Sequence, residues 1–161
     1  MKIIRNPYLN AAVTSVISLA YAAVFILTSG HLEFERILNH GHTLNSAFWN
    51  NWSMFLLHGN LGYIGYVYIA AAISVVMLSI IRKKNYDEYQ AGILTTSFVA
   101  MGVILLLLFP AALLLVLSDP NYAVETLMFI IVAHWSVFLI AKSIYAIRKL
   151  QVQVGHPHGK N

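Results

Sequence analysis

The chain has 161 residues, of which 59% are hydrophobic and only 10% are charged, with ten Lys and Arg against six Asp and Glu. A soluble domain carries about 25% charged residues, so this composition offers too little polar surface to face water. It excludes a soluble domain, a disordered chain and a nucleic-acid-binding module, and it predicts a protein that crosses a membrane several times. Because cysteine is absent, it also excludes disulfides, iron–sulfur clusters, thiolate zinc sites and covalently attached haem.

Four apolar stretches are each long enough to cross a bilayer, which takes about 20 residues in a helix. They cover residues 11–29, 54–81, 91–117 and 122–147, to within a few residues. The third ends at Ser118-Asp119-Pro120-Asn121, which is typical of a turn followed by a new helix. We therefore expect an all-α fold with a single transmembrane four-helix domain over residues 1–150 and a flexible polar tail at 151–161.

Basic residues are distributed unequally between the two sides of these four spans. One side has a single basic residue, Arg36. The side that holds both termini has nine: Lys2, Arg5, Arg82, Lys83, Lys84, Lys142, Arg148, Lys149 and Lys160. Basic flanks of membrane spans stay on the cytoplasmic side. The sequence therefore predicts a multi-pass protein of a prokaryotic plasma (inner) membrane, with both termini cytoplasmic.

The connection between the first two spans, residues 30–52, is long for a link between helices. Its apolar residues include Trp49 and Trp52, and tryptophan is enriched where a membrane meets water. This pattern predicts an outer interfacial segment that lies at the lipid headgroups. The alternative is a cap that covers a ligand at the outer mouth of the bundle.

Ionisable side chains inside a membrane are costly, so each is a candidate functional residue. His58 lies near the outer end of the second span, His134 lies within the fourth, and Lys142 lies near the inner end of the fourth. We expect Lys142 to extend toward the inner headgroups. Glu125 follows the turn closely, so we expect it at the outer interface.

Histidines are concentrated on the predicted outer side, where His31, His40 and His42 join His58. Imidazole nitrogens bind zinc, copper, nickel and iron. These four side chains are therefore candidate ligands of a metal ion, and the alternative is that those in loops are merely solvated.

Three glycines, Gly59, Gly62 and Gly65, recur at every third position and so share one face of a helix. Such a face allows another body to approach the backbone closely. The partner is either a neighbouring helix, as in small-residue packing within membranes, or a planar cofactor such as haem with His58 as an axial ligand.

The segment His58-Gly59-Asn60-Leu61-Gly62-Tyr63 resembles the start of a span in membrane cytochrome b subunits, including bd-type quinol oxidases and their shorter relatives. The resemblance is confined to this short stretch, and here Gly59 follows His58 directly, unlike the spacing in those families. It implies that His58 binds b-type haem and that the chain is one subunit of a larger complex.

Depth in the membrane limits how the histidines can pair. His58 lies 24 residues from Arg82, which is ~36 Å along a helix. His134 lies 14 residues from Arg148, which is ~21 Å. A haem iron needs its two axial ligands at one level, so this difference disfavours a pair formed by His58 and His134.

Two other pairings agree better with depth. A haem in the middle of the membrane would use His134 and Met101, since histidine with methionine is an established axial pair. A haem at the outer side would join His58 to one of three residues: His31, His40 or His42.

We therefore expect a membrane-embedded electron-transfer subunit that binds b-type haem and exchanges electrons with quinone or a partner subunit, as part of a respiratory complex. One alternative is a non-catalytic accessory subunit, packed against other membrane subunits or in a homo-oligomer. Another is a protein that handles a metal or small solute through its outer histidines. The sequence contains no nucleotide-binding loop and no nucleophile elbow.

Overall fold

A computed structural model describes residues 6–38, 46–81 and 88–154 of the chain, and these residues are almost entirely helical. This confirms the all-α fold. The elements are α1 (Pro7–Thr28), α2 (Leu32–Leu38), α3 (Ala47–Leu57), α4 (Leu61–Ile80), α5 (Glu88–Ser118), the short 3₁₀ helix η1 (Pro120–Tyr122) and α6 (Ala123–Val154).

Four of these helices are long and apolar enough to cross a membrane, as predicted. Their spans are Pro7–Thr28, Leu61–Ile80, Ala91–Ser118 and Pro120–Ile144. The second begins later than the expected residue 54, because Met54 belongs to α3 and the backbone turns at Gly59 before α4 starts. Gly59 has φ of +71°, a conformation that glycine adopts at little cost and that ends the preceding helix.

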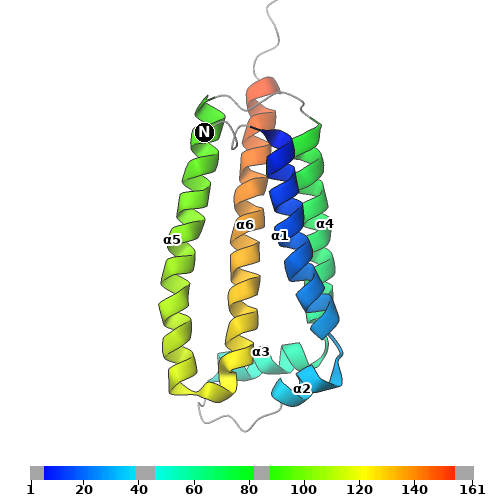
Figure 1. The fold of residues 1–161 in the computed structure, drawn as a ribbon, viewed down its shortest axis with the longest axis vertical. Helices are drawn as coiled ribbons and strands as arrows, with labels where there is room; N and C mark the ends of the chain where they lie inside the picture. Colours follow the sequence, from blue (N-terminus) through cyan, green and yellow to red (C-terminus); the bar gives the residue numbers. More distant parts are fainter. Residues whose placement is uncertain (1–5, 39–45, 82–87, 155–161) are drawn as a thin grey trace, which may run out of the picture.

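The four spanning helices run side by side along the long axis of the molecule (Figure 1). The short helices α2, α3 and η1 gather at one end, which we call the cap end, while α1 begins and α6 finishes toward the other, the terminal end. Among the helices, α1 packs mainly against α4 and α5 mainly against α6, while α4 and α6 join the two pairs. The expected interfacial segment thus contains two helices, α2 and α3.

Local signals explain where several helices begin. The Asn6 side chain accepts hydrogen bonds from the first turn of α1, and Pro7 occupies the first helical position, where no backbone donor is needed. Ser46 caps α3 in the same way. Asp119 accepts a bond from the backbone of Asn121 and so starts η1, which confirms the predicted turn.

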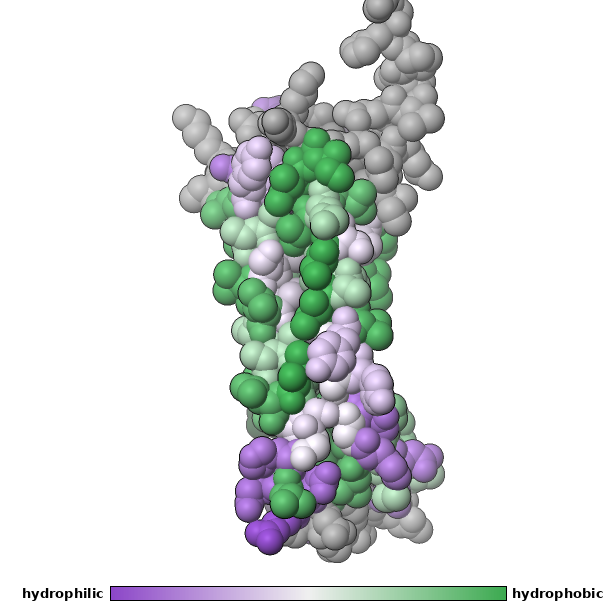
Figure 2. Space-filling view, turned by 90° about the vertical axis from the view of Figure 1, so that its right-hand side faces the viewer, coloured by the Kyte–Doolittle hydropathy of each residue, from purple (hydrophilic) through white to green (hydrophobic). Residues whose placement is uncertain are grey.

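The core lies where α1, α4 and α6 meet. Trp135 of α6 is fully buried, and its indole ring contacts the rings of Phe25, Tyr21 and Tyr68. On the face of the molecule that Figure 2 shows, apolar residues dominate the middle of the bundle, and polar residues gather at the cap end. This pattern suits a protein whose long sides face lipid.

Helix α5 is less buried than the other three spanning helices. Only 6% of its most apolar stretch is buried in the bundle, against 33% for α6. It stands at one edge of the bundle (Figure 1) and remains helical through Pro110. Most of its surface therefore faces outward along the whole membrane span.

Candidate functional site

Polar side chains of α6 meet polar side chains of α1 and α4 in the middle of the bundle. We call this group the central polar cluster, and it consists of Ser18, Tyr21, Tyr68, His134, Trp135 and Ser136. Three hydrogen bonds connect its members in pairs. In hydrocarbon such bonds hold helices together, because an unpaired polar group there is costly.

The His134 imidazole is half-buried and takes part in one of these bonds. Its Nδ1 atom lies 2.8 Å from the Tyr21 hydroxyl oxygen, and the two rings meet edge to face. Met101, the partner expected for a haem in mid-membrane, is buried in the apolar core instead. The polar contact that the structure shows for His134 is thus with Tyr21, on the opposite helix.

Trp135 and Tyr68 make the other two bonds of the cluster. The Trp135 indole nitrogen donates to the Ser18 hydroxyl at 3.1 Å, which joins α6 to α1. The hydroxyls of Tyr68 and Ser136 lie 2.5 Å apart and join α4 to α6. Sequence reasoning singled out His134 but missed how these residues pair, since serine and tyrosine are common in membrane helices and only their pairing makes them notable.

The glycine face of α4 is covered by α1. A Cβ atom added at Gly62 would lie 3.0 Å from the Ser29 hydroxyl oxygen, and one added at Gly65 would lie 3.3 Å from Ile26. The Gly62 backbone also donates to that hydroxyl. A neighbouring helix therefore occupies this face, and a flat macrocycle does not fit against it without displacing α1.

His58 ends α3 and so does not lie within a spanning helix. Its Nδ1 atom lies 2.6 Å from the Met54 carbonyl oxygen, and the residue is exposed. The Ser29 hydroxyl donates to the Gly59 carbonyl, which brings the turn before His31 against the turn after His58. The structure thus places these two histidines on adjacent turns at the cap end.

The other outer histidines, His40 and His42, lie outside the described residues. Within the residues that are described, no three side chains of His, Cys, Asp or Glu gather closely enough to hold a metal ion.

Lys142 does not extend to the headgroups as expected, because its side chain is only 4% exposed. The ammonium group donates to the Asn10 side-chain oxygen and lies 4.5 Å from the centre of the Phe98 ring. It also lies over the Phe138 ring. The lysine therefore points into the bundle, where α1, α5 and α6 supply its partners.

Glu125, in the first turn of α6, is likewise buried, with 0% exposure. Ser53 of α3 donates to its carboxylate at 3.0 Å, and the Trp52 indole donates to its backbone carbonyl at 3.0 Å. Because α3 folds back over the start of α6, the chain itself covers this residue.

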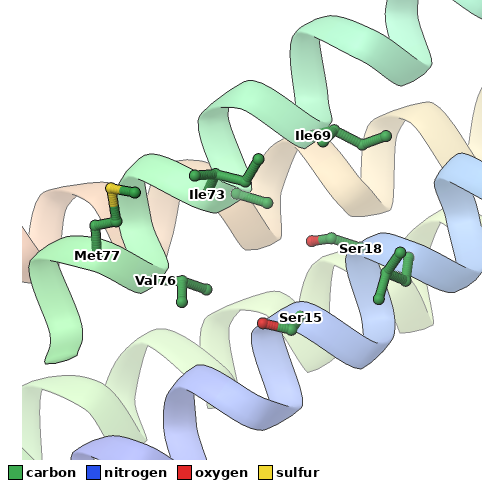
Figure 3. A pocket seen from close by; sticks show the side chains of 8 residues that line it. Ser15, Ser18, Ile69, Ile73, Val76 and Met77 are labelled. Atoms are coloured by element: carbon green, nitrogen blue, oxygen red, sulfur yellow. The ribbon is translucent and has the colours of Figure 1, made fainter.

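A groove of about 320 Å³ opens between α1 and α4. Ser15 and Ser18 line it from α1, and they face apolar side chains of α4 (Figure 3). The complete lining is Ser15, Ser18, Leu19, Ile69, Ala72, Ile73, Val76 and Met77. Sequence reasoning missed this groove, because its shape depends on how the two helices cross.

Comparison with known proteins gave no relative: no protein-family model, curated protein or solved structure matches this chain. The resemblance of the segment around His58 to cytochrome b subunits therefore stays a prediction.

Proposed function

We propose that this chain is a non-catalytic subunit of a larger membrane assembly, which it joins through α5. The observation that carries the proposal is the exposure of α5. Only 6% of its most apolar stretch is buried within the chain. The other spanning helices make polar bonds across the bundle, whereas α5 contacts Lys142 of α6 through the apolar ring of Phe98.

The exposed face of α5 also has the small residues that favour contact between membrane helices. Gly92, Thr96 and Ala100 are all exposed and follow one another at intervals of four, so they form one stripe. A Cβ atom added at Gly92 would meet nothing within 4 Å. Small residues at this spacing let two helix backbones approach closely, so the expected occupant is a spanning helix of another subunit.

The interior of the bundle supports a structural role as well. Several of its buried polar groups are engaged with groups on neighbouring helices, as in the central polar cluster and in the Lys142–Asn10 contact. Each of these pairings connects elements of the chain to one another. A rigid bundle with one exposed helix is what a docking subunit requires.

The test is photocrosslinking in native membranes, with a benzophenone amino acid at Ala100 on α5. The matched control carries the same group at Val67, which is 63% exposed on α4. We expect a discrete protein adduct from position 100 alone, and a bulky Gly92→Leu change should abolish it. Equal labelling from both positions, or an adduct with the mass of a dimer of this chain, would overturn the proposal.

A second candidate function is a haem or metal centre at the cap end, because His31 and His58 lie on adjacent turns. The Nδ1 contact of His58 with the Met54 carbonyl leaves Nε2 to bind a metal, as is usual for histidine ligands. Reduced-minus-oxidised absorption spectra of purified protein test this candidate. A b-type band that His58→Ala removes would support it, and a flat spectrum with haem supplied during expression would contradict it.

A further inference from the structure

The serines of the groove between α1 and α4 differ from most other hydroxyl residues of the spanning helices. Ser74, Ser79 and Thr95 each donate to the backbone carbonyl four residues earlier, as do others of their kind. Such a bond satisfies the hydroxyl within its own helix. Ser15 and Ser18 make no such bond, although their preceding turns belong to the described residues.

The two serines leave hydrogen-bonding capacity directed at the groove. Ser18 accepts from Trp135, but its own hydroxyl proton has no acceptor among the described residues. Ser15 is half-buried and has no hydrogen-bond partner in that part of the chain. Because Ser15 and Ser18 lie three positions apart, they share one helix face, so both hydroxyls line the same groove (Figure 3).

Depth restricts what can satisfy these hydroxyls. Ser15 lies eight residues and Ser18 eleven residues after Pro7, which places them ~12 and ~17 Å from the end of a helix that spans the bilayer. The hydrocarbon core is about 30 Å thick, so Ser18 lies near its middle. The ester carbonyls of phospholipids stay at the edge of that core, too far away to accept from either serine.

We propose that the groove between α1 and α4 binds a lipid-soluble quinone, whose ring carbonyl accepts hydrogen bonds from Ser15 and Ser18. A quinone is apolar enough to move within the bilayer and carries strong acceptors on a flat ring, which suits an apolar groove with two donors. The volume of about 320 Å³ lies at the lower end of the range for ligand sites. Ile69, Ile73 and Met77 supply its apolar wall.

Trp135 provides a direct readout, because its indole bonds to Ser18 and quinones quench tryptophan fluorescence. The chain contains three tryptophans, so a Trp49→Phe/Trp52→Phe background leaves Trp135 alone. Titration with a benzoquinone that carries a decyl side chain should quench this fluorescence in a saturable way. Ser15→Ala should weaken the apparent affinity about fivefold, as expected for one lost hydrogen bond.

Ser74→Ala is the matched control, since Ser74 is exposed on α4 and its hydroxyl is already bonded to the Ala70 carbonyl. It should leave the titration unchanged. Because Ser18→Ala also removes the partner of Trp135, Ser15→Ala with an unchanged melting temperature is the decisive variant.

Decylbenzene, which lacks the carbonyls, tests whether the polar groups matter. It should displace the quinone only weakly. The proposal is overturned if quenching is linear and unsaturable, if Ser15→Ala leaves the affinity unchanged, or if decylbenzene competes as well as the quinone. In the last two cases the groove is a site for hydrocarbon chains alone. These results do not depend on whether α5 docks another subunit.

Discussion

Lys142 is the residue whose place in the structure differs most from expectation. A lysine near the inner end of a span usually extends to the headgroups. Here Asn10 and the Phe98 ring hold the side chain inside the bundle. A buried cation is costly unless an acceptor and a polarisable surface compensate for lost hydration. Both are present, and they come from two other helices.

This arrangement predicts an asymmetric response to substitution. Asn10→Ala leaves the ammonium group buried without its oxygen acceptor and should lower stability by about 1–3 kcal/mol. Lys142→Met removes the charge, keeps apolar contact with Phe98, and should cost less. Unfolding in mixed micelles measures both changes.

The double variant completes the thermodynamic cycle between Asn10 and Lys142. In the Lys142→Met background, Asn10→Ala should have little further effect, since the group that needed the acceptor is gone. Additive losses would show that the two side chains do not interact.

Gly62 and Gly102 give a matched comparison at the same scale. Alanine at Gly62 would bring its Cβ to 3.0 Å from the Ser29 hydroxyl, which cannot retreat without breaking its bonds to Gly59 and Gly62. Gly62→Ala should therefore destabilise the bundle by about 1 kcal/mol. Gly102→Ala meets nothing within 4 Å and should be neutral or stabilising because of its helix propensity. Thermal unfolding of both variants in one detergent measures these changes in stability. Equal changes at the two positions would contradict a role for close packing at Gly62.

At the scale of elements, α3 is attached to the bundle through a few polar bonds. Ser53 donates to the Glu125 carboxylate at 3.0 Å and lies 3.4 Å from the Leu38 carbonyl, so one hydroxyl connects α2, α3 and α6. Tyr122 adds a bond to Asn50 of α3 at 2.7 Å. The short helices are thus fixed to the start of α6 and do not simply float at the headgroups.

Ser53→Ala should loosen α3 without disturbing the spanning helices. It leaves the buried Glu125 carboxylate without one donor. We expect this to weaken the packing of α3 against the bundle by about 1–3 kcal/mol. Hydrogen exchange should become faster in α3 and stay unchanged in α4. Uniformly faster exchange would mean that α3 and the bundle unfold together, while no change would show that Ser53 is dispensable.

At the scale of the whole molecule, the bundle has two chemically different ends. The sequence assigns nine basic residues to the terminal end and one to the cap end. Because basic flanks remain in the cytoplasm, the terminal end should face inward. The chain has no native cysteine, so this orientation is open to direct labelling.

Single cysteines at Leu32 and Ile81 test the orientation, since both positions are exposed and lie at opposite ends of the bundle. In intact cells a membrane-impermeant maleimide should label Leu32→Cys and leave Ile81→Cys unlabelled. After permeabilisation both should react equally. The reverse pattern would place the cap end in the cytoplasm.

Much of the architecture was predictable from the sequence because the bilayer simplifies the problem. A stretch of about 20 apolar residues has to be helical in hydrocarbon, where each backbone group needs an internal partner. Four spans therefore follow from hydropathy, and the turn at Asp119-Pro120 follows from local capping chemistry. The predicted second span began too early, at residue 54, because the end of α3 is also apolar. Only the turn at Gly59 separates α3 from α4.

The partners of the buried polar residues were not predictable. Nothing local distinguishes Ser18, which accepts from Trp135, from Ser74, which bonds its own helix. Likewise, nothing in the sequence shows that Lys142 pairs with Asn10 or that Glu125 pairs with Ser53. The sequence by itself determined the number of membrane-spanning helices and the turn before the last one, because hydropathy and capping act over neighbouring residues. Only the tertiary structure decided which polar groups are paired and where a groove remains, because these depend on how helices distant in sequence are rotated and crossed.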